Sequence, residues 1–175
     1  DVRYTFEVDF MDAARGAKRR ITMPDGRELD LTVPASLRDG QVLRLKSKGM
    51  PGVGGGPNGD ALITFHVKAH KLFRREGNDV HVELPIALHE AVLGGKVRVP
   101  TIDGPVTMTV PKNTNSGDRL RLKGKGFAVG KGDKRGDQHI SLRVVLPEEP
   151  DAELEAFLQS WAEAHSYDPR VDMEV

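Results

Sequence analysis

The stretch Gly-Gln-Val-Leu-Arg-Leu-Lys-Ser-Lys-Gly at residues 40–49 recurs, 77 positions later, as Gly-Asp-Arg-Leu-Arg-Leu-Lys-Gly-Lys-Gly at residues 117–126. The same offset relates Pro34 and Gly59-Asp60 to Pro111 and Gly136-Asp137. Earlier in the chain the offset is 78, and it relates Ala13, Gly16, Lys18 and Gly26 to Ala91, Gly94, Lys96 and Gly104. Because glycine and proline set backbone angles, their recurrence repeats backbone requirements as well as composition. The sequence therefore predicts two copies of one domain in tandem.

Each copy has the residue pattern of a β domain. Apolar and polar residues alternate in five short segments, at residues 29–33, 43–45, 63–67, 106–110 and 140–144. One short helix per copy is predicted, from Met11 to Arg15 and from Ala87 to Leu93, each ended by the glycine that follows it. Since each sheet has one apolar face to bury, we expect a mostly β chain of two tandem β-sandwich-like domains. The expected boundaries are residues 1–78 and 79–149, with the seam near Gly77-Asn78.

A different pattern begins after Pro150. Apolar residues recur there at spacings of three and four, at Leu154, Phe157, Leu158 and Trp161. This spacing predicts an amphipathic helix, with Asp151 as its N-terminal cap. The apolar face has two possible partners, its own domain or a second copy of the chain, and the second would make residues 150–175 a dimerisation tail.

Composition excludes several classes of function. Lys plus Arg equals Asp plus Glu at 26 each, whereas a protein dedicated to nucleic acid normally carries a basic excess, so nucleic acid is not an expected partner. The chain has no cysteine, which removes disulfides and cysteine-based zinc sites and fits a cytoplasmic protein. No apolar run approaches the roughly 20 residues that span a bilayer. Because the chain starts inside a strand-like pattern, at Tyr4, Phe6, Val8 and Phe10, we expect it to be a fragment of something longer.

Two patterns resemble catalytic or cofactor motifs. Residues 54–59, Gly-Gly-Gly-Pro-Asn-Gly, match the glycine spacing of a dinucleotide site, but such a site needs a helix after the glycines, and here a strand pattern follows. His66 and His70 lie four apart on and after a strand, where that spacing does not bring two imidazoles around a metal. No recognisable nucleophile motif is present. We expect no catalytic residues, no metal and no cofactor.

A basic run precedes an apolar pair. Arg15, Lys18, Arg19 and Arg20 lead directly into Ile21 and Met23. Composition alone favours a solvated strand face for this run. The apolar residues that follow it directly favour a surface that binds a peptide with apolar side chains and an acidic end.

Longer motifs resemble the C-terminal region of DnaJ-type J-domain co-chaperones. In the first copy the resemblance rests on Phe-Met-Asp-Ala-Ala-Arg-Gly at 10–16, on Pro-Ala-Ser-Leu-Arg-Asp-Gly-Gln at 34–41, and on residues 59–62 and 70–79. In the second copy it rests on Ala-Val-Leu-Gly-Gly at 91–95, Val-Pro-Thr-Ile-Asp-Gly at 99–104 and Leu-Lys-Gly-Lys-Gly at 122–126. It covers essentially the whole chain. Because there is no His-Pro-Asp tripeptide and no cysteine-rich zinc module, the chain looks like the zinc-free, CbpA-like subclass without its J-domain.

The resemblance implies a non-enzymatic chaperone module. In the family, a shallow apolar groove in the first domain takes an extended peptide as an added strand, either a non-native client or the acidic C-terminal tail of a DnaK-type chaperone. The groove positions carried onto this sequence are Tyr4, Phe6, Ile21 and Met23, with Arg19 as the tail-binding cation. The resemblance also implies a homodimer formed through the C-terminal segment.

The second copy departs from this pattern, and two other functions stay open. At the positions equivalent to the groove it has Val82, Leu84 and Val99, and it has Val97-Arg98 in place of Arg19-Arg20, so tail binding is expected in the first copy. One alternative is a dimerisation and spacing scaffold, with recognition carried by upstream segments. The other is an enzyme that uses the Gly-rich loop at 49–59 as a nucleotide site.

Overall fold

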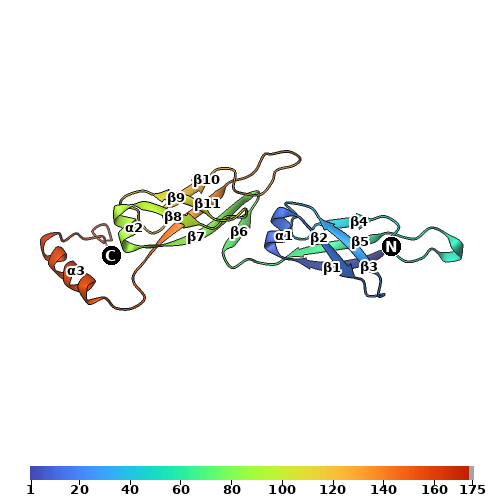
Figure 1. Ribbon diagram of the computed structural model, residues 1–175, viewed down its shortest axis with the longest axis horizontal. Helices are drawn as coiled ribbons and strands as arrows, with labels where there is room; N and C mark the ends of the chain where they lie inside the picture. Colours follow the sequence, from blue (N-terminus) through green and yellow to red (C-terminus); the bar gives the residue numbers. More distant parts are fainter. Residues whose placement is uncertain (174–175) are drawn as a thin grey trace. The chain divides into compact units, whose positions relative to one another are not determined.

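The computed structural model describes residues 1–173 and divides the chain into two compact units, Asp1–Val144 and Val145–Val175. The chain is mostly β, as predicted. The first unit contains both copies of the repeat, and the second contains the terminal helix (Figure 1).

The first copy consists of two small sheets. One has the strand order β1-β5-β4, in which β1 is parallel and β4 antiparallel to β5, and the other is the antiparallel pair β2-β3. The elements are β1 (Val2–Val8), α1 (Phe10–Arg15), β2 (Ala17–Thr22), β3 (Glu28–Val33), β4 (Val42–Leu45), a 3-10 turn η1 (Val53–Gly55) and β5 (Ala61–Val67).

The second copy repeats this arrangement and adds one strand. Its sheets have the orders β10-β11-β7-β6 and β8-β9. The elements are β6 (Phe73–Glu76), β7 (Asp79–Ala87), α2 (Leu88–Leu93), β8 (Gly95–Val99), β9 (Val106–Val110), β10 (Arg119–Leu122) and β11 (Gln138–Val145). All of them except β6 have a counterpart 77 or 78 residues earlier, so the predicted duplication is confirmed at the level of secondary structure.

The extra strand bears on the expected seam between the copies. Gly77 and Asn78 form the turn between β6 and β7, which pair antiparallel. The sheet of the second copy therefore begins at Phe73, before the expected boundary at residue 78. The division of the chain into separate domains remains a prediction.

Both predicted short helices are present, each ended by the expected glycine. Gly16 has φ 78° and Gly94 has φ 70°, the left-handed region that favours glycine. A side chain on Gly94 would also meet the backbone oxygen of Val110, 2.8 Å from its β-carbon. α1 begins at Phe10, which the alternation of the first residues had placed on a strand.

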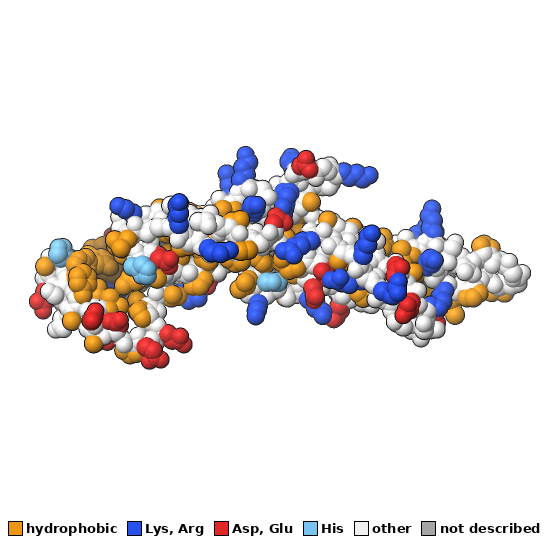
Figure 2. Space-filling model, viewed as in Figure 1, with side chains coloured by type: hydrophobic (Ala, Val, Ile, Leu, Met, Phe, Trp, Pro, Cys, Tyr) orange, Lys and Arg blue, Asp and Glu red, His pale blue; other side chains and the backbone are white. Residues whose placement is uncertain are grey.

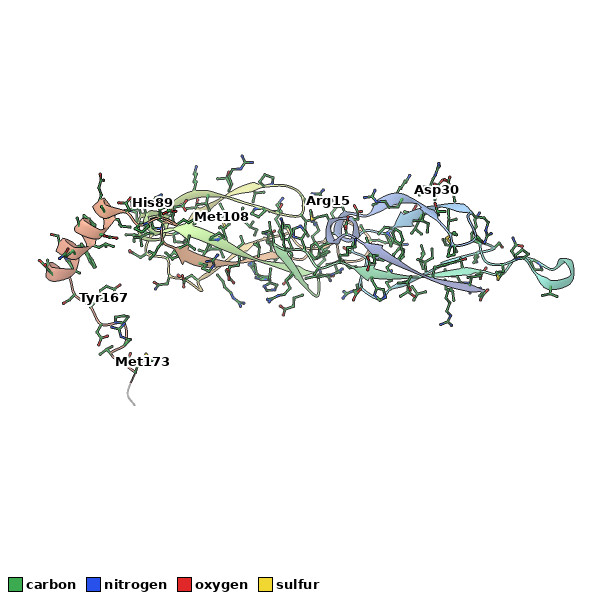
Figure 3. All side chains as sticks on the ribbon, turned by 90° about the horizontal axis from the view of Figure 1, so that it is seen from below. Arg15, Asp30, His89, Met108, Tyr167 and Met173 are labelled. Atoms are coloured by element: carbon green, nitrogen blue, oxygen red, sulfur yellow. The ribbon has the colours of Figure 1, made fainter. Side chains whose placement is uncertain are left out.

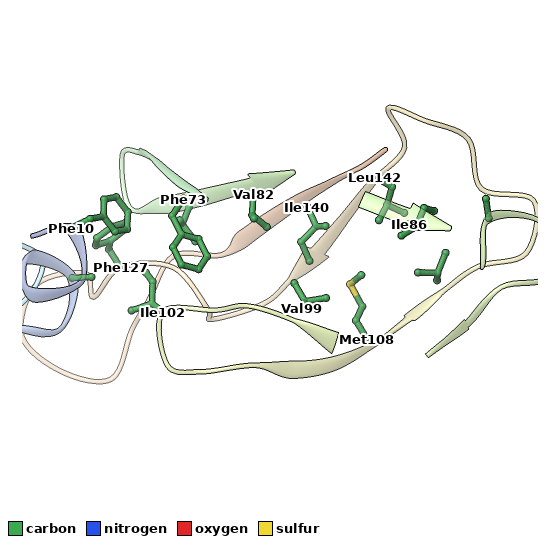
Figure 4. Close-up of a cluster of buried hydrophobic side chains, with 14 residues drawn as sticks. Phe10, Phe73, Val82, Ile86, Val99, Ile102, Met108, Phe127, Ile140 and Leu142 are labelled. Atoms are coloured by element: carbon green, nitrogen blue, oxygen red, sulfur yellow. The ribbon is translucent and has the colours of Figure 1, made fainter. Parts of the chain in front are cut away.

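Two hydrophobic cores hold the copies together internally. The first contains Leu31, Val33, Ile63 and Phe65 with their neighbours on β1 and α1. The second contains Phe127, Ile140 and Leu142 with their neighbours, and it also includes Phe10 from α1 (Figure 4). Phe10 and Ala14 of the first copy thus belong to the core of the second.

Further contacts join the two copies. Arg15 lies on α1 (Figure 3). Its Nε donates a hydrogen bond to the carbonyl oxygen of Ile102, and the two atoms are 2.8 Å apart. Arg75 donates to the carbonyl oxygen of Leu37 at 2.8 Å, and its guanidinium lies 4.0 Å from the centre of the Phe127 ring. Burial lowers the pKa of Arg75, and the nearby positive charge of Arg38 lowers it further.

The predicted C-terminal helix is α3 (Ala152–Ala164). Asp151 caps it as predicted, because its carboxylate accepts from the backbone N–H of Leu154 at 2.9 Å. Across residues 1–173, no helix is both long enough and apolar enough to cross a membrane.

Candidate peptide-binding site

Two strand edges of the first copy carry the predicted groove residues. Among the described residues, β1 pairs only with β5, and β2 pairs only with β3, so each has one unpaired edge. The N–H and C=O groups along such an edge are free to pair with another extended chain. This is the backbone requirement for strand addition.

Tyr4 and Phe6 face inward from β1. Both are half-buried and pack against the first core, and Phe6 meets Phe65 edge to face with ring centroids 6.2 Å apart. The side chains that alternate with them, Arg3 and Thr5, are exposed. The strand thus has an apolar face of partly accessible aromatic rings and a polar outer face.

Ile21 and Met23 differ in accessibility. Ile21 lies on β2 opposite Leu29 and is half-buried against the same core as Tyr4 and Phe6. Met23 follows the end of β2 at Thr22 and is only 5% exposed. Ile21 therefore offers a ligand more apolar surface than Met23 does.

Arg19 and Arg20 point to opposite faces of β2. Arg19 shares the face of Ile21 and forms an ion pair with Asp12 of α1. Arg20 lies on the outer face, where Nε donates to Asp30 at 2.9 Å, and this hydrogen bond holds the pKa of Asp30 below its usual value. Only Arg19 is therefore on the side of the predicted groove. An arginine has five N–H donors, so Arg19 can donate to a second carboxylate while it is paired with Asp12.

Sequence reasoning missed a cavity where the two copies meet. Its volume is about 390 Å³, and its lining includes Phe10, Val67, His70, Phe73 and Phe127. None of the predicted groove residues lines it. The aromatic residues were visible in the sequence, but their convergence depends on contacts between separate copies, for which no local pattern exists.

The Gly-rich loop lacks the surroundings of a dinucleotide site. The 3-10 turn η1 lies in it, and the strand β5 follows at Ala61. A dinucleotide site instead needs a helix whose N-terminus meets the pyrophosphate. Over residues 1–173, no group of three or more His, Cys, Asp or Glu side chains is placed to hold a metal ion.

The predicted dimerisation residues form an accessible apolar surface on α3. Phe157 is 64% exposed, Leu158 and Trp161 are each 39% exposed, and Leu154 is half-buried. Hydrophobic side chains gather over this segment beside acidic ones (Figure 2). Trp161 stacks on His165, with ring centroids 5.2 Å apart, within the same unit.

Comparison with known proteins agrees with this architecture. The family model for the DnaJ C terminal domain matches residues 2–147. A curved DNA-binding protein of Coxiella burnetii is 40% identical over 147 residues, which cover 84% of this chain and 46% of that protein. A chaperone protein DnaJ of Bacillus velezensis is 46% identical over 121 residues, which cover 69% of this chain and 32% of that protein. A curved DNA-binding protein of Escherichia fergusonii is 42% identical over 147 residues, which cover 83% of this chain and 47% of that protein.

The chain thus spans about half or less of the length of these relatives. Of these three relatives, one is named a chaperone and two are named curved DNA-binding proteins. With the family model covering both β copies and relatives at 40% identity or above, the chain belongs to the DnaJ C-terminal domain family.

Proposed function

We propose that this chain is a co-chaperone module that binds non-native polypeptide segments and the acidic C-terminal tail of a DnaK-type chaperone, and presents clients to that chaperone. The binding residues are Tyr4, Phe6, Ile21 and Met23, with Arg19 contacting the acidic tail. The module acts in the cytoplasm as a homodimer formed through α3, and it carries out no catalysis of its own.

One observation carries this proposal: among residues 1–173, β1 and β2 each have an unpaired edge, and their half-buried apolar side chains share one core. Strand addition provides main-chain hydrogen bonds that do not depend on peptide sequence, while side-chain pockets provide selectivity. Burying one more aliphatic side chain contributes about 1.5–3 kcal/mol, before the cost of ordering the peptide. Two or three such contacts give weak, reversible binding, which suits a module that hands its client on.

The test is a fluorescence-anisotropy titration of a labelled peptide, apolar in the middle and acidic at its C-terminus. Ile21→Glu should weaken binding at least about tenfold, because a charge replaces an apolar contact worth roughly 1.4 kcal/mol or more. Thr22→Glu is the matched control, since it adds the same charge one residue along, where the side chain is exposed. Circular dichroism checks that both variants are folded.

Arg19→Ala provides a second variant that does not disturb the core. It should weaken binding of the acidic peptide and leave an otherwise identical peptide with an amidated, neutral end unaffected. Equal binding by wild type, Ile21→Glu and Arg19→Ala places the site elsewhere and contradicts the proposal. If no peptide binds to the wild type, the scaffold function becomes the better explanation.

DNA binding is the second candidate, because two of the relatives above are named curved DNA-binding proteins. The equal numbers of basic and acidic residues weigh against it in this chain, as do the ion pairs of Arg19 and Arg20 with acidic neighbours. A labelled duplex titrated in parallel at about 0.15 M salt should show no saturable binding at concentrations that saturate the peptide. Tighter binding of the duplex than of the peptide would favour DNA.

A further inference from the structure

A polar cleft lies between the two β copies, which belong to one compact unit. The first copy contributes the segment that leads into β4, and the second contributes β6, the turn that follows it and the loop between β10 and β11. The cleft has a volume of about 390 Å³, which is within the range of roughly 300–1,000 Å³ for small-molecule sites. None of the predicted groove residues lines it, so it is separate from the peptide-binding site.

Two arginines line this cleft. Arg38 comes from the first copy and is exposed, and Arg75 comes from β6 and is half-buried. Across residues 1–173, no Asp or Glu lines the cleft, and neither arginine forms an ion pair within 4.0 Å. Burial lowers the pKa of Arg75, and the positive charge of Arg38 adds to this effect. The two guanidiniums therefore repel each other across a space to which the described residues bring no negative charge.

The carboxylates that follow these arginines in the sequence are bound elsewhere. Asp39 accepts a hydrogen bond from the backbone N–H of Val67 at 2.9 Å. A carboxylate oxygen of Glu76 lies 3.1 Å from Nε2 of His81. The charges of the two arginines thus remain available to a ligand in the cleft.

The hydrogen-bond donors of the cleft are only partly used. Arg75 is held in place by two backbone carbonyl oxygens, each 2.8 Å from one of its nitrogens. The Nη2 of Arg38 approaches Asn78 only to 3.4 Å, beyond the usual range of about 2.7–3.2 Å. Ser36 also lines the cleft, and its buried hydroxyl has no hydrogen-bond partner among the described residues. Arg38 and Ser36 can therefore donate to a ligand without losing a strong hydrogen bond.

We propose that this cleft binds a small soluble anion that carries phosphate groups. The forked N–H donors of an arginine match two oxygens of a phosphate group. A carboxylate has two oxygens in one plane and suits a single guanidinium, whereas a phosphate group has three acceptor oxygens that point in different directions. A phosphate can therefore accept from Arg38, Arg75 and Ser36 together. Because these donors come from both copies, the bound anion also ties the copies to each other.

The test is isothermal titration calorimetry of the full chain with inorganic pyrophosphate, at constant ionic strength so that the screening of charges does not change. The wild type should bind with a Kd of about 1 mM or tighter. Arg38→Gln should weaken binding at least about tenfold, because it removes a charged donor with two parallel N–H groups. Arg38→Lys should have an intermediate affinity, because it keeps the charge and loses the fork. Arg74→Gln is the matched control: Arg74 is exposed on β6 and does not line the cleft, so its loss should leave the affinity unchanged.

Thermal unfolding provides a second readout. Pyrophosphate at about 10 mM should raise the midpoint of the wild type and of Arg74→Gln, and raise that of Arg38→Gln much less, because a ligand stabilises the folded state in proportion to its affinity for it. Circular dichroism before the titrations checks that all variants are folded.

Three outcomes overturn the inference or its choice of ligand. Equal affinities of Arg38→Gln and Arg74→Gln for pyrophosphate, or no saturable binding to the wild type at about 10 mM, overturn the site itself. Citrate presents carboxylates in place of phosphates and should bind more weakly, so equal binding of citrate overturns the choice of phosphate. Vesicles that contain phosphatidic acid should not sediment the protein, and sedimentation that Arg38→Gln abolishes overturns a soluble ligand in favour of a lipid headgroup. None of these outcomes depends on the proposed peptide binding.

Discussion

Two pairs of repeated glycines, Gly49 with Gly126 and Gly59 with Gly136, lie where one backbone segment passes another too closely for any side chain. A β-carbon on Gly49 would lie 2.5 Å from the backbone oxygen of Asp60, and one on Gly126 would lie 2.4 Å from that of Asn78. Gly59 and Gly136 approach Asp1 and Asn78 in the same way. These are the glycines that recur with the 77-residue offset, so the repeat preserves close backbone approaches as well as turns.

The neighbouring aspartates complete each of these turns. Asp60 accepts from the backbone N–H of Ser47 at 2.8 Å, and its repeat partner Asp137 accepts from that of Gly124 at 2.9 Å. The hydrogen bond from Ser47 lowers the pKa of Asp60, and the hydrogen bond from Arg44 lowers it further. The repeated Gly-Asp pair thus has one structural role in both copies.

Gly126→Ala should destabilise the protein by about 1–3 kcal/mol, because the added methyl group forces the backbone around Asn78 to shift. Thermal unfolding followed by circular dichroism should show a midpoint several degrees lower. Gly56→Ala is the matched control: its β-carbon would lie 3.4 Å from the nearest backbone oxygen, an ordinary contact, and its φ is −70°. Equal midpoints for the two variants would contradict the steric explanation.

At the scale of the element, the sequence of α3 carries the cap, the spacing and the charges that favour a helix. None of the residues of α3 is buried. Its cap, its spacing of apolar residues and its acidic first turn were all readable from the sequence. Phe157 and Trp161 nevertheless remain exposed in the single chain. Apolar side chains grouped on one helix face indicate an interaction surface, which supports a second copy as the partner.

Phe157→Asp should abolish the proposed dimer, because it places a charge in the centre of that apolar face. Size-exclusion chromatography with light scattering on the full chain measures the mass. Gln159→Asp is the control, since residue 159 lies on the polar face of the helix and should leave the dimer intact. A monomeric wild type, or a dimeric Phe157→Asp variant, would refute a dimer formed through α3.

At the scale of the whole molecule, the aromatic cluster between the two β copies is the feature that local patterns concealed. Phe10 of α1 stacks on Phe73, with ring centroids 6.1 Å apart, and meets Phe127 edge to face at 5.6 Å. Arg75 covers Phe127 and bonds back to Leu37. These contacts join the two β copies, which belong to one compact unit.

Arg75→Ala should lower the free energy of unfolding by about 2 kcal/mol, because it removes a charged hydrogen bond and a cation–π contact. Urea denaturation measures the stability, and NMR relaxation should show the two copies tumbling less uniformly. Arg74→Ala is the control, since Arg74 is exposed and its side chain forms no hydrogen bond or ion pair among the described residues. Identical stability for the two variants argues against Arg75 as a tie between the copies.

The sequence alone determined the duplicated β architecture, both short helices with their terminal glycines, and the capped helix α3. Each rests on a local rule: glycine at a positive φ, alternation along a strand, or a carboxylate at a helix N-terminus. The tertiary structure decided the rest. It placed β6 on the edge of β7, buried Met23 more than Ile21, and moved Phe10 into the second core. These features depend on which distant segments pack together, and local sequence patterns do not specify such long-range contacts.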